Sequence, residues 1–198
     1  PAVLTINNVD YDSVGVRYKG NSTFCLPNDA SNQKVPYNID INYFVGGQKV
    51  MGYKKMKLAN AWMDPTFMKQ VISAKIYQEY LPTGESNLVK LFSQGNYVGM
   101  YVNDESINKQ FLDKHFDEKN GPLFKCDNID RFCDTSGAPS AMPPNLNFLG
   151  DDSTLYYNSY DMKSDHGWTE LVDLIRTIVY EFQNIDSVLN VDRTLWAF

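Results

Sequence analysis

Basic side chains gather in the first third of the 198-residue chain, at spacings that place them on the polar sides of three short segments. Alternation of apolar and polar residues predicts a strand for each segment. If the strands pair, the cations share one face of one sheet. Clustered cations repel, so a cluster is typical of an anion site, and phosphate suits lysine and arginine. The alternative from the pattern alone is a solvated face that binds nothing. The residues concerned are Arg17, Lys19, Lys34, Lys55 and Lys57.

The overall charge narrows the classes of ligand. Residues 1–60 hold seven basic and four acidic residues, the rest holds 11 and 20, and the net charge is −6. This balance excludes a general nucleic-acid binder, because phosphate backbones need a basic footprint. With 43% hydrophobic residues and no apolar run near the ~20 residues of a membrane span, the chain is globular and has no predicted membrane span.

The elements that must position the cations are predicted from periodicity. Strands are expected at Val14–Lys19, Val35–Tyr43 and Tyr53–Ala59, with a polar loop over residues 28–33. A helix then opens at Asp64-Pro65, with Asp64 as its N-cap. Its predicted apolar stripe consists of Phe67, Val71, Ile72, Ile76 and Tyr80.

A hairpin and further helices follow. Strands at Asn87–Phe92 and Tyr97–Val102 flank a turn over residues 93–96, and Asn103 or Asp104 is expected to cap the next helix. Beyond it lie an extended piece at residues 123–125, a loop over 126–147 and a strong helix at 168–182. A last helix starts at Asn190 or Asp192, and we expect the chain to continue past Phe198, because an apolar helical turn ends there.

The three cysteines leave two interpretations open. A disulfide between Cys126 and Cys133 is feasible by sequence separation and leaves Cys25 over; three reduced thiols fit equally well. With two histidines, no cluster has the spacing of a zinc site.

Eight short motifs follow one another along the chain, each weak alone but fairly specific in their order. They are Arg17–Thr23, Lys34 before an alternating strand, Tyr53–Asn60, Asp64–Met68, Tyr97–Tyr101 with Glu105, Gly121–Lys125, Leu149–Asp151 and Tyr160–Lys163. Together they resemble the spore coat protein H (CotH) family, over about residues 10–196. That family includes atypical protein kinases.

The resemblance implies an α+β fold: a kinase-like small lobe, mainly antiparallel sheet with helices, over residues 1–125, and the helical start of a larger lobe, truncated at Phe198, over 126–198. It also implies ATP and Mg²⁺ as cofactors of the full-length protein, and transfer of the γ-phosphoryl group to protein serine or threonine. The protein substrate is unknown.

Site residues carry over by position. Lys34 and Lys57 are expected to face the phosphates, and Glu105 is expected to pair with one of these lysines. The residues expected at the border of the site and near the rim of the cleft are Arg17, Lys19, Asn21, Lys125 and Lys163.

Two departures from the family pattern bear on activity. Where many members read Met-Arg-Glu, this chain reads Met68-Lys69-Gln70, and a glutamine cannot form the lysine–glutamate ion pair of an active kinase. The family's catalytic and metal-binding aspartates are expected beyond Phe198, so the fragment alone is expected to be inactive. The alternative function is a non-catalytic surface or coat binding module that keeps the CotH fold, and a secreted or cell-surface location is expected.

Overall fold

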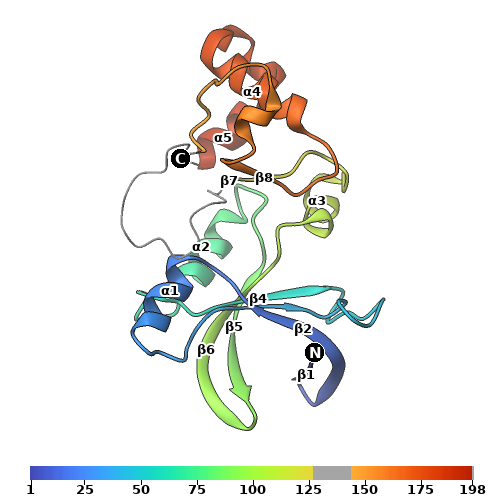
Figure 1. Ribbon diagram of the computed structural model, residues 1–198, viewed down its shortest axis with the longest axis vertical. Helices are drawn as coiled ribbons and strands as arrows, with labels where there is room; N and C mark the ends of the chain where they lie inside the picture. Colours follow the sequence, from blue (N-terminus) through green and yellow to red (C-terminus); the bar gives the residue numbers. More distant parts are fainter. Residues whose placement is uncertain (127–143, 198) are drawn as a thin grey trace. The chain divides into compact units, whose positions relative to one another are not determined.

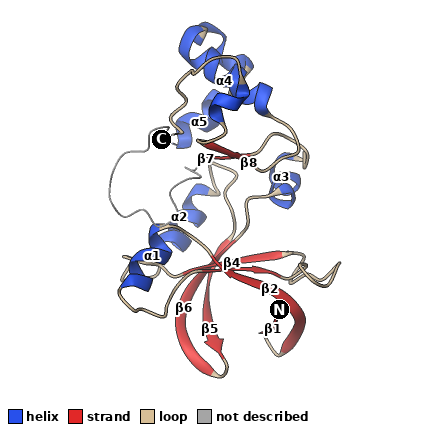
Figure 2. Cartoon of the chain, viewed as in Figure 1, coloured by secondary structure: helices blue, strands red, loops and turns tan. Residues whose placement is uncertain are grey.

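The computed structural model describes residues 1–126 and 144–197, and the chain divides into two compact units, residues 1–106 and 107–198 (Figure 1). A six-stranded sheet and helices give the predicted α+β fold, with strands dominating the first unit and helices the second (Figure 2). The division into lobes at residues 125 and 126 remains a prediction about the family's architecture.

The sheet of the first unit is antiparallel and ordered β1-β2-β3-β4-β6-β5. Five strands lie where alternation predicts them, with different ends, and β1 was not predicted. The strands are β1 Ala2–Ile6, β2 Val9–Tyr18, β3 Tyr37–Asp40, β4 Lys55–Ala59, β5 Ser86–Ser93 and β6 Asn96–Asp104.

One face of this sheet holds the core of the unit. Its centre is a cluster of fully or nearly fully buried side chains: Val14, Ile39, Ile41, Val50, Leu58 and Tyr101. Since successive side chains of a strand point to opposite faces, Arg17, Lys55 and Lys57 lie on the other face, as predicted.

The hairpin of β5 and β6 closes through Gln94 and Gly95, both with positive φ (50° and 79°). Ser93 pairs with Asn96, so the loop has two residues, and its twist matches that of the strands. The predicted turn is confirmed.

The helices of the first unit differ from prediction. Helix α1, Ser22–Asp29, contains Pro27 and no apolar stripe, so its pattern did not predict it. Helix α2, Lys69–Tyr77, begins five residues after Asp64, whose carboxylate accepts from the N–H groups of Thr66 and Lys69 and so holds a turn before the helix. The predicted stripe is wrong as a core face, because Val71 is buried but Ile72 and Ile76 are about half exposed.

The second unit is built around a separate core. Tyr156, Tyr160, Leu171, Val172 and Ile175 form it. The elements are α3 Lys109–Phe116, β7 Phe124–Cys126, β8 Tyr160–Met162, α4 Trp168–Tyr180 and α5 Val191–Ala197, with 3-10 helices η1 Ser153–Tyr156 and η2 Phe182–Ser187.

Two predicted helix caps have different outcomes. Asn108 caps α3, its side chain accepting from the N–H groups of Gln110 and Phe111, so the expected cap at Asn103 or Asp104 is wrong. Both of those residues instead pair with β4 and β5 as part of β6. Asn190 is confirmed, since its side chain accepts from the Arg193 N–H before α5.

The cysteines follow neither predicted interpretation. Cys126 is a free thiol, which excludes its pairing with Cys133, and Cys25 is disulfide-bonded, which excludes three reduced thiols. Cys133 itself lies outside the described residues. Within the described ranges, no helix is long and apolar enough to cross a membrane.

Candidate functional site

A row of polar side chains crosses four strands on the face opposite the core of the first unit. Arg17 of β2 pairs with Asn38 of β3, Asn38 pairs with Lys57 of β4, and Lys57 pairs with Asp104 of β6. Partners in antiparallel strands have neighbouring side chains on the same face. The register therefore brings two predicted cations, Arg17 and Lys57, into a row that ends at a carboxylate.

Asp104 is held from two further elements. Gln70 of α2 donates from Nε2 to Asp104 Oδ2 at 2.6 Å, and Ser86 of β5 donates from Oγ to Oδ1 at 2.9 Å. Both carboxylate oxygens thus have a donor, and the side chain has a fixed orientation. Sequence reasoning missed this role, because an aspartate before a helical pattern resembles a cap.

The pKa of Asp104 is raised, and the main cause is burial, which disfavours the charged carboxylate. The hydrogen bond from Ser86, the positive charges of Lys19 and Lys57 and the hydrogen bond from Gln70 all act in the opposite direction. Both lysines are therefore close enough to Asp104 for their charges to lower the pKa of its carboxyl group.

Lys19 lies near this row, since its charge acts on Asp104, whereas a place for Asn21 beside the row stays a prediction. Lys19 follows β2, and its N–H donates to the Pro36 carbonyl at 3.1 Å. Asn21 precedes α1, and its carbonyl accepts from the N–H groups of Phe24 and Cys25. Arg17 is exposed, and its Nη1 donates to the Tyr18 carbonyl at 3.3 Å.

Lys34 lies elsewhere in the first unit. Its Nζ is 4.0 Å from the centre of the Phe67 ring and 5.6 Å from that of Tyr101, and its stem packs against Gly99. Tyr101 belongs to the core face, opposite to Lys57. Burial lowers the pKa of the Lys34 ammonium. The structure therefore does not bring Lys34 into the row with Lys57.

Glu105 is 9% exposed and forms hydrogen bonds with Glu85, the residue that precedes β5. Its carboxylate accepts from the Glu85 N–H at 3.0 Å, and its own N–H donates to the Glu85 carbonyl at 2.8 Å. Pairing of Glu105 with a lysine stays a prediction.

The two remaining predicted residues lie in the second unit. Lys125 of β7 pairs with Asp161 of β8 through the backbone, and the Lys163 ammonium forms an ion pair with the carboxylate of Asp161. Both side chains are exposed.

A cavity of about 240 Å³ adjoins Asp104 in the first unit. It combines apolar side chains with amides, hydroxyl and charged groups, a mixture typical of small-molecule sites. Asn103 Oδ1 is buried and has no hydrogen-bond partner among the described residues, so it is an acceptor available at this wall. The lining residues are Val50, Met51, Tyr53, Lys55, Met56, Glu85, Ser86, Asn87, Asn103, Asp104 and Glu105.

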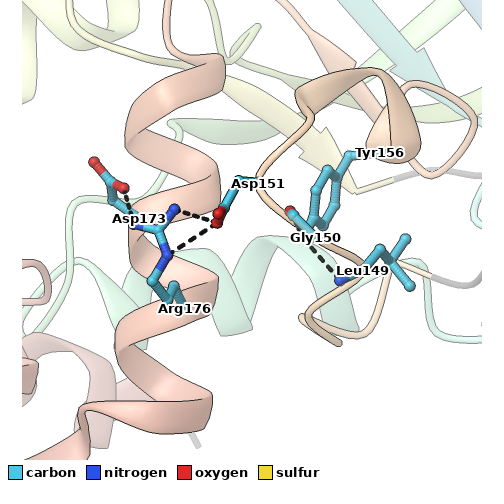
Figure 3. Close-up of polar contacts among 6 residues, drawn as sticks. All are labelled: Leu149, Gly150, Asp151, Tyr156, Asp173 and Arg176. Carbon is cyan, nitrogen blue, oxygen red and sulfur yellow. Dashed lines mark hydrogen bonds and ion pairs between the residues drawn. The ribbon is translucent and has the colours of Figure 1, made fainter.

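The motif Leu149–Asp151 has a structural role in the second unit (Figure 3). The hydroxyl of buried Tyr156 accepts from the Leu149 N–H and donates to the Gly150 carbonyl, both at 2.9 Å. Asp151 accepts from Arg176 of α4 at 2.5 Å, and Arg176 also reaches Asp173 at 2.7 Å. The motif therefore ties a loop to α4.

Residues 127–143 aside, no group of three or more histidine, cysteine or acidic side chains in this chain is arranged to hold a metal ion. The candidate site is thus a cationic row with one carboxylate and a neighbouring cavity.

Comparison with known families gives a match over residues 16–196 to the family described as CotH kinase protein, which spans nearly the whole chain and agrees with the resemblance found in the motifs. No curated protein matches the chain.

Proposed function

The chain belongs to the CotH kinase protein family, and on that premise we propose that it supplies the nucleotide-binding lobe of an atypical protein kinase. The full-length protein would transfer the γ-phosphoryl group of ATP to serine or threonine of a protein, with catalytic aspartates beyond Phe198. The observation that carries the proposal is the row in which Lys57 lies between Arg17 and the partly buried Asp104.

The described residues fit a nucleotide in two respects. Lys57, Lys19 and Arg17 supply positive charge on one face, which phosphates require. The adjoining cavity offers apolar contacts and a free amide oxygen at Asn103, which suit a base with exocyclic donors. Mg²⁺ with ATP supplies the charge neutralisation that phosphoryl transfer needs. The residues of this chain bind and orient the phosphates.

One observation favours the alternative, a non-catalytic surface or coat module. Position 70 on α2 carries an amide, and Gln70 is bonded to Asp104 rather than to a lysine. A protein that keeps the kinase-like fold only for binding does not need a carboxylate on this helix, and an amide at position 70 fits such a protein.

A secreted or cell-surface location is part of the proposal. The disulfide at Cys25 supports it, because disulfides persist in oxidising compartments and are rare in the cytosol.

Calorimetric titration with ATP, with and without Mg²⁺, tests the proposal on this chain and on a version extended past Phe198. We expect Lys57→Ala to weaken ATP binding about 10- to 100-fold, as expected for loss of one charged hydrogen bond to phosphate. Lys34→Ala is measured beside it, because Lys34 packs over Phe67 and its contribution is separable from that of Lys57.

Lys90→Ala is the matched control. Lys90 is exposed on the neighbouring strand β5 and pairs with Met100, four residues along from Asp104, so ATP affinity should not change. Absence of ATP binding by both proteins would refute the nucleotide-binding role and favour the binding module.

A further inference from the structure

We propose that Asp104 is the carboxylate that positions Lys57, in place of the helix glutamate of other kinases, and that Gln70 holds Asp104 from α2; this inference rests on the proposed function.

The register supports the pairing of Asp104 with Lys57. The two residues are direct cross-strand partners in β6 and β4, so their side chains lie next to each other on one face. The positive charge of Lys57 acts on the carboxylate, as does that of Lys19 after β2. An active kinase needs a carboxylate beside this lysine to hold the ammonium where the phosphates bind.

The orientation of the carboxylate is set by elements other than β6. Gln70 Nε2 fixes Oδ2 at 2.6 Å from α2, and Ser86 Oγ fixes Oδ1 at 2.9 Å from β5. A side chain fixed in this way can position a flexible lysine, because its own rotamer is determined. Helix α2 thus influences Lys57 indirectly: the Gln70 amide holds the Asp104 carboxylate, and that carboxylate lies next to Lys57.

The same geometry explains the glutamine of Met68-Lys69-Gln70. An amide can donate to Asp104, whereas a glutamate at position 70 would set two carboxylates against each other at hydrogen-bonding distance. Positions 70 and 104 therefore have room for one carboxylate between them, and in this chain it is on β6, at Asp104. Gln70 is then a partner of Asp104 and not a sign of lost activity.

Glu105, the residue after Asp104, has a contact of its own. Its carboxylate accepts from the Glu85 backbone N–H and anchors the start of β5. The groups facing Asp104 from the packed elements are Lys19, Lys57, Gln70 and Ser86.

The test exchanges the carboxylate between the two positions. Three variants are compared with the full-length protein: Asp104→Asn, Gln70→Glu, and both together. Asp40→Asn is the control, since Asp40 lies on the same sheet face but forms its ion pair with Lys55 at 3.2 Å. The first readout, which needs no nucleotide, is the ¹³C shift of the Lys57 ε-methylene followed by NMR as pH changes.

In the unsubstituted protein, the ¹³C shift of Lys57 should change at the pH where Asp104 ionises, as a second step besides the one from deprotonation of Lys57 itself. Asp104→Asn should abolish that step, and Asp40→Asn should keep it. The second readout is turnover: Asp104→Asn should lower kcat about 10- to 100-fold, as misplacement of a catalytic group does, with a smaller change in ATP affinity. The double variant should restore kcat, because the carboxylate returns on α2.

Absence of the second step in the original protein, or a double variant no more active than Asp104→Asn, would overturn the inference. A second step in a protein that binds no ATP would support the Lys57–Asp104 pairing and refute the kinase function instead. A third outcome is that Lys57→Ala loses ATP binding while Asp104→Asn changes neither readout. That result would support the proposed function and refute the role of Asp104.

Discussion

Asp104 shows at the scale of one residue how burial and charge oppose each other. Burial raises its pKa although two lysines and two hydrogen bonds favour the ionised form. When the pKa of a carboxyl group is higher in the folded protein than in the unfolded chain, its ionised form is disfavoured by folding. Ionisation of Asp104 therefore has a cost in folding free energy, which is typical of functional groups.

Asp104→Asn should for this reason raise the melting temperature near pH 7. The stabilising effect of a carboxyl with a raised pKa is complete below its unfolded value of about 3.9 and is lost as pH rises through the folded pKa. The gain should thus appear on going from pH 4 to pH 7, because the amide stays neutral. Thermal melts of both proteins across that range measure it, and a lower melting temperature at pH 7 would contradict it.

Sequence patterns place Lys57 and Arg17 on one sheet face but do not reveal Asp104 or Ser86 beside them. Alternation assigns a residue to a face, so cations in a strand can be placed from the sequence alone. The ends of β6 and the start of α3 depend on tertiary pairing, so the sequence pattern alone predicts a cap at Asp104. Lys34 precedes β3, where alternation does not apply, so the predicted face for its side chain differs from the position in the structure.

At the scale of elements, the loop before η1 depends on one hydroxyl. Tyr156 is fully buried, and its hydroxyl joins the Leu149 N–H and the Gly150 carbonyl (Figure 3). Removing that hydroxyl leaves a partly buried donor and a partly buried acceptor without this partner.

Tyr156→Phe should lower the free energy of unfolding of the second unit by about 1–3 kcal/mol. Urea denaturation followed by circular dichroism measures the change. Tyr157→Phe, at the next position and with a side chain 43% exposed, serves as control and should have little effect. Equal effects of the two substitutions would show that the hydroxyl of Tyr156 does not hold the loop.

Strands proved more predictable than helices in this chain. Their period of two is visible over five residues, as in β4, and the Gln94-Gly95 turn fixes the β5–β6 register. Helix α1 has no such signal, because Pro27 and its mixed composition hide it. Helix α2 starts late because the carboxylate of Asp64 binds the N–H of Lys69, a contact that spacing alone does not reveal.

For the whole molecule, the relevant fact is that each unit has its own core. The cluster around Leu58 and Tyr101 belongs to the first unit, and that around Ile175 belongs to the second. The charges also divide, with ten basic and nine acidic residues in the first unit against eight and 15 in the second. Composition revealed that asymmetry, whereas the two cores became visible only in the fold.

Ile175→Ala should therefore destabilise the second unit by about 2–5 kcal/mol, as truncation of a fully buried isoleucine does. Hydrogen exchange should rise in α4 and η1 and stay nearly unchanged in β4 and β6. Val179→Ala, at a position 45% exposed on the same helix, is the control. Equal acceleration of exchange in both units would show that the two cores unfold together.

Gly99 has a φ of +152°, and a Cβ there would lie 3.1 Å from Cε of Lys34. The stem of Lys34 passes over Gly99 on its way to the Phe67 ring, and the missing side chain at position 99 leaves room for it. The two positions are thus linked across 65 residues of sequence. Any side chain gained at position 99 during evolution would push the Lys34 stem aside by a few tenths of an ångström and would also hold a backbone conformation that L-residues rarely adopt, so the backbone and the neighbouring lysine both favour glycine there.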